Sequence, residues 1–198
     1  MPDATYEAWR RVHLRRCLHG VATVALACIA GTGALAQDKS PVRSLDIVQN
    51  DDGYVATVVM FAPVPPGIAW NVLTDFENMH KWVPNVRESK VAARDGNTVT
   101  IEQKGVAKFG LLSFPYETAR RMQLDPPASI QSTQVSGSMR RLGSLMKVSP
   151  DGAGTRLDYR LEIEPAGVAA AVMSKKFLQH ELTEQFTAIV GEMVKRGK

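Results

Sequence analysis

The chain has few of the residues on which covalent and redox catalysis depends. Its two cysteines, Cys17 and Cys28, and two of its four histidines lie within the first 36 residues. The sequence also has no G-x-S-x-G motif, no dinucleotide-binding glycine pattern and no P-loop. The two other histidines, His80 and His180, have no neighbours at metal-ligand spacing. We therefore predict no catalytic set, no metal and no cofactor.

The apolar run at residues 21–36 is too short to span a membrane, which takes about 20 residues. It follows an arginine-rich segment and ends in Ala-Leu-Ala, a pattern typical of a bacterial secretory signal peptide. We predict a signal peptide over residues 1–36, cleaved after Ala36, and a periplasmic or secreted protein. The alternative is an uncleaved leader that anchors the chain. A flexible lead-in is expected at 37–44 and a single domain at 45–198.

The excess of positive over negative charge is small once this leader is set aside. Without its four arginines and two acids, the formal net charge falls from +4 to +2. The sequence also has no basic patch with interleaved aromatics, so we expect no nucleic-acid partner. With both cysteines in the leader, residues 37–198 cannot form a disulfide.

The sequence is rich in strand patterns. Two strands around an Asn-Asp-Asp-Gly turn end at Phe61. From Val83 to Glu164, apolar and polar residues alternate almost without interruption, broken by turn sequences such as Asp95-Gly96 and Ser-Pro-Asp-Gly. Five or six consecutive strands with short connections predict an antiparallel meander.

Three segments have helical patterns. Pro65 and Pro66 suit the first turn of a short helix that ends near Asp75, and a second short helix is expected before Trp82. One long helix is predicted over 168–195, with Glu181 on its polar side and a single apolar stripe. The stripe is formed by Leu178, Leu182, Phe186, Ile189 and Met193. A helix with a single apolar stripe buries only one of its faces. We therefore expect this helix to pack with that face against the concave side of the meander.

This order of elements, with the segments WNVLTDFENMHKWVPNV and SGSMRRLGSLMKVSPDGAGTRLDYRLEIEP and the final helix, resembles the START-like (SRPBCC) superfamily. The similarity covers residues 45–195 and is greatest to the coenzyme Q-binding and polyketide cyclase/dehydrase branch. It implies an α+β helix-grip (Bet v 1-like) fold. In that fold a curved antiparallel sheet wraps around a long C-terminal helix, and two short helices lie near the N-terminus. It also implies a cavity for an apolar ligand between sheet and helix.

The candidate ligand-binding residues share strand or helix faces with apolar neighbours or lie at the cavity's expected edge. They are Trp82, Gln103, Phe114, Tyr116, Arg120, Gln134, Tyr159 and Phe177. As a lone cation, Arg120 could orient a carboxylate, a phosphate or a quinone oxygen. Alternatively, Arg120 faces solvent or pairs with an acidic side chain, since a buried unpaired charge is costly. For Trp82 the alternative is a role in fixing the entry to the next strand.

Three functions fit this pattern. The leading hypothesis is a binding protein that holds a hydrophobic small molecule such as a lipid, a quinone-like or a polyketide-like compound. The second is a polyketide cyclase or dehydrase that uses the same cavity, with Arg120 and Tyr116 steering proton transfer. The third is a module that docks transiently on a membrane or a protein through an exposed lip at 76–82.

Overall fold

The computed structural model describes residues 40–198. The predicted signal peptide and its cleavage site lie outside these residues. Eight strands form one antiparallel sheet in the order β1-β2-β8-β7-β6-β5-β4-β3. They are β1 (Val42–Gln49), β2 (Tyr54–Ala62), β3 (Val86–Asp95), β4 (Thr98–Phe109), β5 (Leu112–Asp125), β6 (Ser129–Gly137), β7 (Met139–Asp151) and β8 (Gly154–Pro165). Strands β3 to β8 follow one another as neighbours, which is the predicted meander.

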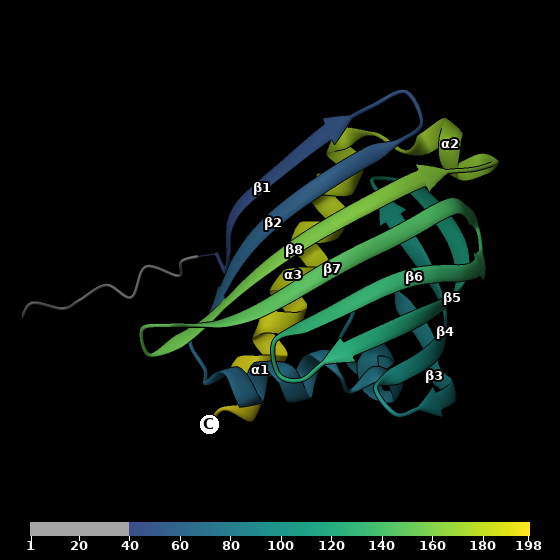
Figure 1. The fold of residues 1–198 in the computed structure, drawn as a ribbon. Helices are drawn as coiled ribbons and strands as arrows, with labels where there is room; N and C mark the ends of the chain where they lie inside the picture. The colour runs from purple at the N-terminus through teal and green to yellow at the C-terminus, as the bar shows by residue number, and fades with distance from the viewer. Residues whose placement is uncertain (1–39) are drawn as a thin grey trace, which may run out of the picture. The chain divides into compact units, whose positions relative to one another are not determined.

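The long helix α3 (Lys175–Arg196) runs across one face of this curved sheet (Figure 1). The short helix α1 (Pro66–Leu73) and the 3-10 helix η2 (Phe76–Lys81) connect β2 to β3. The helix α2 (Val168–Val172) precedes α3. Residues of α3 pack on α1 and on β1, β2 and β4. The helix therefore meets the sheet near both edges.

Two expectations about the helices need correction. The two short helices do not lie near the N-terminus but follow the first two strands, and the second of them is a 3-10 helix. The single helix expected over 168–195 is divided, because Met173 is extended and Ser174 begins a new helix. The Ser174 hydroxyl caps α3 by accepting from the Phe177 N–H at 3.2 Å. The Tyr54 hydroxyl donates to the Met173 carbonyl, which satisfies a backbone group at the break.

The sheet also begins earlier than expected. Residues 42–44 were assigned to the lead-in but belong to β1, where Val42 pairs with Met60 and Ser44 with Val59. This strand forms one edge of the sheet, and most of its side chains are exposed or half-buried.

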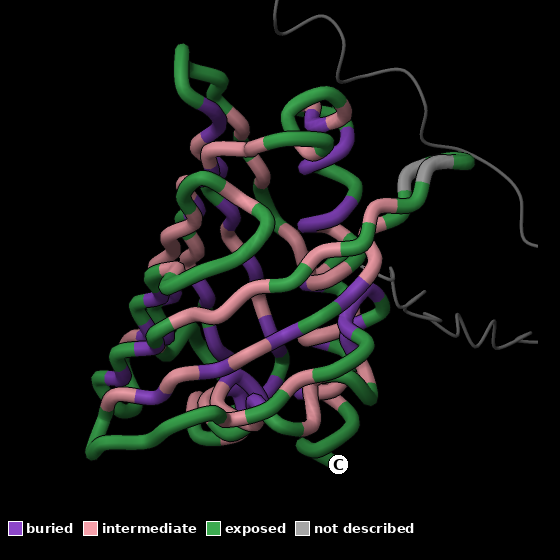
Figure 2. The backbone as a smooth tube through the Cα atoms, turned by 90° about the vertical axis from the view of Figure 1, so that its right-hand side faces the viewer, coloured by how far each residue is buried: buried purple, intermediate pink, exposed green. Residues whose placement is uncertain are grey.

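The core lies between the sheet and α3. Along β2 the burial alternates, with Val58 and Met60 fully covered, and β8 adds Leu157. Figure 2 shows the buried segments on the strands and on the helix, with exposed residues at the hairpin tips. The predicted stripe of α3 is buried apart from Ile189, and Val190 is buried in its place. Ile189 instead borders a cavity.

Among the described residues, no helix has the length and hydropathy needed to cross a membrane.

The end of α3 is held against η2 by Arg196. Its guanidinium lies 4.7 Å from the ring centroid of Trp82 and 2.8 Å from a carboxylate oxygen of Asp75. A second ion pair, with Glu192, also measures 2.8 Å. Arg196 therefore joins two segments that are far apart in the sequence.

We expect Arg196→Ala to lower the free energy of unfolding by about 1–2 kcal/mol, because it removes a cation–π contact and a partly buried ion pair. Urea denaturation measures the change. Lys195→Ala is the matched control, since Lys195 is exposed and pairs with Glu192 alone, at 3.3 Å. Equal losses in the two variants would contradict a bridging role for Arg196.

Candidate functional site

A cavity of about 680 Å³ lies between the sheet and α3. Its walls come mainly from β4, β5, β7, β8, α2 and α3, with contributions from η2 and the segment before β3, and most of the lining side chains are apolar. This volume is within the range of about 300–1,000 Å³ found for small-molecule pockets. The cavity arises because α3 packs near the edges of the curved sheet and leaves space over the middle strands.

A dry space of this size would be incompatible with a stable fold. At about 24 cal/mol per Å³, it would cost ~16 kcal/mol. Total stability of a domain is about 5–15 kcal/mol. Water or an apolar molecule must therefore occupy much of this volume, or the walls must move inward.

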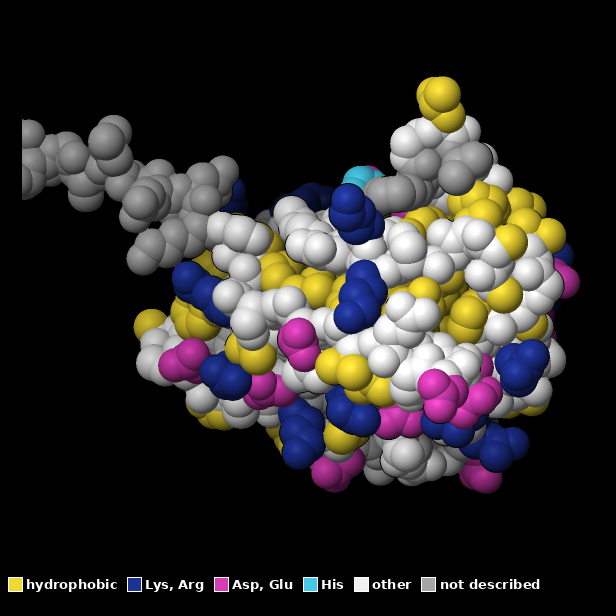
Figure 3. All heavy atoms as spheres, turned by 90° about the horizontal axis from the view of Figure 1, so that it is seen from above, with side chains coloured by type: hydrophobic (Ala, Val, Ile, Leu, Met, Phe, Trp, Pro, Cys, Tyr) yellow, Lys and Arg dark blue, Asp and Glu magenta, His cyan; other side chains and the backbone are white. Residues whose placement is uncertain are grey.

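The end of the cavity that carries α2 is partly apolar on the outside. Val168 of α2 lines the cavity and is also 72% exposed. In Figure 3, which looks down on this end, hydrophobic side chains gather on one side of the surface, with lysines and arginines around them.

One polar bridge connects α3 to the sheet across the cavity wall. The Asn85 side-chain amide donates to the Glu181 carboxylate at 2.7 Å, and the Asn85 carbonyl accepts from the Tyr116 hydroxyl at 3.2 Å. The other carboxylate oxygen of Glu181 accepts from the backbone N–H of Lys108 at 3.3 Å. The loop before β3, the helix and strand β5 are thereby held together.

Gly105 allows this bridge to form. A Cβ atom at this position would lie 2.0 Å from the Asn85 carbonyl oxygen and 2.6 Å from the Tyr116 hydroxyl. Both distances are far below van der Waals contact. Only glycine lets the backbone of β4 approach Asn85 and Tyr116 this closely.

Arg120 and Gln103 form a second polar group on the cavity wall. The Arg120 guanidinium donates to the side-chain oxygen of Gln103, whose amide nitrogen donates to the Ser89 hydroxyl at 3.0 Å. The Nε atom of Arg120 is buried and has no hydrogen-bond partner among residues 40–198. Burial lowers the pKa of Arg120, although an arginine side chain stays protonated in proteins.

Two tyrosines lie close to this arginine and face the same space. Burial raises the pKa of Tyr116 to about 12 and also raises the pKa of Tyr159. Tyr159 packs edge-on against Phe186 of α3, with ring centroids 4.9 Å apart. Near neutral pH both phenols therefore hold their protons, and the Tyr116 hydroxyl donates its proton to the Asn85 carbonyl.

Six of the eight predicted site residues line the cavity: Gln103, Phe114, Tyr116, Arg120, Tyr159 and Phe177. They come from three strands and the first turn of α3. Phe114 and Phe177 meet edge-on, with centroids 6.2 Å apart. Their part in binding a ligand stays a prediction.

The other two residues lie elsewhere, which corrects their assignment to the cavity. The ring of Trp82 packs beneath Arg196 at the end of α3. Gln134 uses its amide to donate to the carbonyl of Met139 at 2.8 Å and does not line the cavity. The predicted lip at 76–82 is only partly exposed, because Phe76 is 2% exposed while Glu77, His80 and Lys81 are exposed. Docking through this segment stays a prediction.

Sequence reasoning missed Asn85 and misplaced Glu181. Glu181 was expected on the polar side of the last helix but is 5% exposed. It lies three residues after Leu178 and four after Phe177, so helical spacing alone places it on the buried stripe. Because Glu181 is charged, it was assigned to the polar side of the helix despite this spacing. Asn85 carries no comparable signal.

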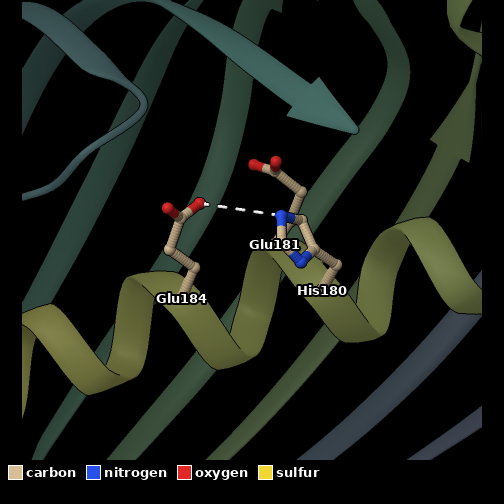
Figure 4. A group of neighbouring side chains, drawn as sticks. All are labelled: His180, Glu181 and Glu184. Atoms are coloured by element: carbon tan, nitrogen blue, oxygen red, sulfur yellow. Dashed lines mark ion pairs between the residues drawn. The ribbon is translucent and has the colours of Figure 1, made fainter. Parts of the chain in front are cut away.

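Among the described residues, His180, Glu181 and Glu184 have potential metal-ligand atoms within 4.8 Å of one another. Figure 4 shows His180 and Glu184 facing each other along the helix, with a nitrogen–oxygen distance of 4.0 Å. Both carboxylate oxygens of Glu181 already accept hydrogen bonds from Asn85 and Lys108. This cluster therefore gives no basis for assigning a metal.

The profile of the family described as polyketide cyclase/dehydrase and lipid transport matches residues 55–194. The chain belongs to this family. The match confirms the expected START-like superfamily without singling out a coenzyme Q-binding branch. Comparison with proteins of curated function finds no significant match.

Solved structures share the fold of this chain at low sequence identity. A START superfamily protein from Mycobacterium smegmatis is 14% identical with a TM-score of 0.62, over 73% of this chain and 99% of that one. The STAR-related lipid transfer protein of Xanthomonas axonopodis is 11% identical, with a TM-score of 0.60 and coverage of 75% and 98%. The ZhuI aromatase/cyclase of Streptomyces sp. R1128 is 14% identical, with a TM-score of 0.59 over 73% of this chain and 95% of that one. The helix-grip fold, with its curved sheet and C-terminal helix, is thereby confirmed.

The buried Glu181 predicts a pH-dependent stability. Burial raises the pKa of its carboxyl above the ordinary 4.5, and hydrogen bonds from Asn85 and Lys108 offset part of this shift. A raised pKa in the folded state gives a contribution that is complete below the unfolded-state pKa and is lost as pH rises through the folded-state pKa.

We therefore expect the stability advantage of the wild type over Glu181→Gln to shrink as pH rises from about 4 to 7. Urea denaturation at each pH measures it. Glu184→Gln, an exposed change one turn away, controls for removal of a helix charge. A constant or growing advantage would contradict the burial argument.

Proposed function

We propose that this protein binds a hydrophobic small molecule in the cavity between the sheet and α3 and carries it without converting it. The observation that supports this most is the cavity itself, whose volume of about 680 Å³ is lined mainly by apolar side chains from both layers. Family membership is consistent with this function, because the family description includes lipid transport.

The polar groups on the wall suit binding better than turnover. Glu181 is held by two hydrogen bonds, and burial keeps Tyr116 and Tyr159 protonated near neutral pH. General base catalysis needs a group whose pKa lies near the working pH and whose lone pair is free. These side chains can position a ligand but are poorly placed to accept its protons.

A cyclase-type enzyme is the second candidate. It is favoured by the two phenols and the guanidinium that meet on one wall, since they could hold a reactive chain in a folded conformation. The ZhuI aromatase/cyclase has the same fold. An enzyme would convert a bound polyketide-like chain, whereas a carrier would release it unchanged, so analysis of the ligand after incubation separates these two functions.

Phe114→Ala is expected to weaken binding of the neutral apolar dye N-phenyl-1-naphthylamine by about tenfold, because a buried aromatic contributes about 1.5–3 kcal/mol of burial free energy. Dye fluorescence measures the affinity, and circular dichroism checks the fold. Val135→Ala is the matched control, since Val135 is 55% exposed on β6 and lies away from the cavity. Unchanged affinity in Phe114→Ala would place the binding site elsewhere.

We also propose that the protein acts in the periplasm, on the basis of the leader pattern at residues 1–36. After expression of the full-length chain in a Gram-negative host, we expect the protein in the periplasmic fraction with Gln37 at its N-terminus. N-terminal sequencing of that fraction tests this. Full-length protein in the membrane fraction would instead support an uncleaved anchor.

A further inference from the structure

The cavity contains a charge that the protein itself does not neutralise. Arg120 projects from β5 into a space whose walls are mainly apolar. Within residues 40–198, no acidic side chain forms an ion pair with it, and the ionisable groups that act on it are Tyr159 and Tyr116. Its one hydrogen-bonded side chain is the neutral Gln103. An unpaired cation in such surroundings is costly for the fold.

The guanidinium also has unused hydrogen-bonding capacity. Its Nε–H is buried without an acceptor, and only one of its Nη atoms donates to Gln103. An arginine presents its donors as a planar fork that fits two oxygens of a carboxylate or a phosphate. Part of the side chain is open to the cavity, so a bound molecule can reach it.

The neighbouring groups favour a negative charge at this position. The Tyr116 and Tyr159 hydroxyls remain protonated near neutral pH, so neither phenol places a negative charge beside Arg120. Two acids also line this space. Glu181 has both carboxylate oxygens engaged by Asn85 and Lys108. Glu117 is exposed and lies 3.9 Å from the ammonium of Lys104. Gln103 is held by Ser89 and fixes the orientation of Arg120. The site therefore resembles a pre-formed receptor for an anionic group.

We propose that the ligand is an anionic amphiphile, with a carboxylate or phosphate group bound by Arg120 and an apolar body that fills the rest of the cavity. This inference rests on the proposed ligand-binding function and specifies the class of molecule. A cationic ligand is excluded by repulsion from Arg120. A neutral ligand would leave the charge uncompensated.

The test compares ligands that share one chain and differ in head group: decanoate, decyl phosphate and 1-decanol. Each displaces N-phenyl-1-naphthylamine from protein expressed from the full-length chain, at pH 8, where both acids are ionised. We expect the two anions to bind at least about tenfold more tightly than the alcohol, because hydrogen bonds between charged groups exceed those to a neutral hydroxyl. Acetate and inorganic phosphate should not displace the dye, since they lack the apolar body.

The variant Arg120→Gln keeps hydrogen-bonding capacity but removes the charge. We expect it to lose the preference for the anions while it still binds 1-decanol, and we expect Arg120→Lys to keep part of the preference. Arg121→Gln is the matched control, because Arg121 is the next residue on β5 and is exposed. It should behave as the wild type. These controls separate the local charge from the overall charge of the protein.

The outcomes distinguish this inference from the function on which it rests. Binding of 1-decanol as tight as that of the anions, or an anion preference that survives in Arg120→Gln, would overturn the proposed ligand class and leave the carrier function standing. Failure of all three amphiphiles and of the dye to bind would overturn both. Displacement by inorganic phosphate alone would show a simple anion site and would also contradict an amphiphilic ligand.

Discussion

A single long helix cannot follow a curved sheet along its whole width, and this constraint shapes the molecule. Helix α3 packs on β1, β2 and β4, and the middle strands bend away from it. Many apolar side chains of those strands therefore line a space of about 680 Å³, and Tyr159 of β8 also packs on Phe186 of the helix. Arg196 at one end of α3 and the bridge between Glu181 and Asn85 nearer the other hold the helix in place. The cavity is thus a consequence of how the two layers are joined.

The polar residues of the wall divide into two groups with different consequences. The group around Asn85 is satisfied internally, since the oxygens of Glu181 and the hydroxyl of Tyr116 all have partners. It supports the fold. The group around Arg120 is left with a buried donor and an unneutralised charge. Unsatisfied groups of this kind destabilise a fold unless a ligand completes them, and for this reason Arg120 points to function.

Much of this fold follows from sequence periodicity. Alternation along the strands and the turn residues between them predicted the meander, and the spacing of Leu178, Leu182 and Phe186 predicted the helix that covers it. On strand β5, the same alternation placed Phe114, Tyr116 and Arg120 on one face. Periodicity failed where a tertiary contact decides the outcome. The break before Ser174 depends on a hydrogen bond from Tyr54, the position of Trp82 depends on Arg196, and the burial of Glu181 depends on Asn85, 96 residues away.

Native mass spectrometry shows directly whether the cavity holds an apolar molecule. The protein would be expressed from the full-length chain, purified without detergent and weighed intact, and any bound compound would then be extracted and identified. We expect a mass above that of the polypeptide by one molecule of a compound with a large apolar body, and we expect this molecule to be lost on denaturation. A mass equal to that of the polypeptide alone, unchanged after incubation with lipid and quinone mixtures, would contradict it.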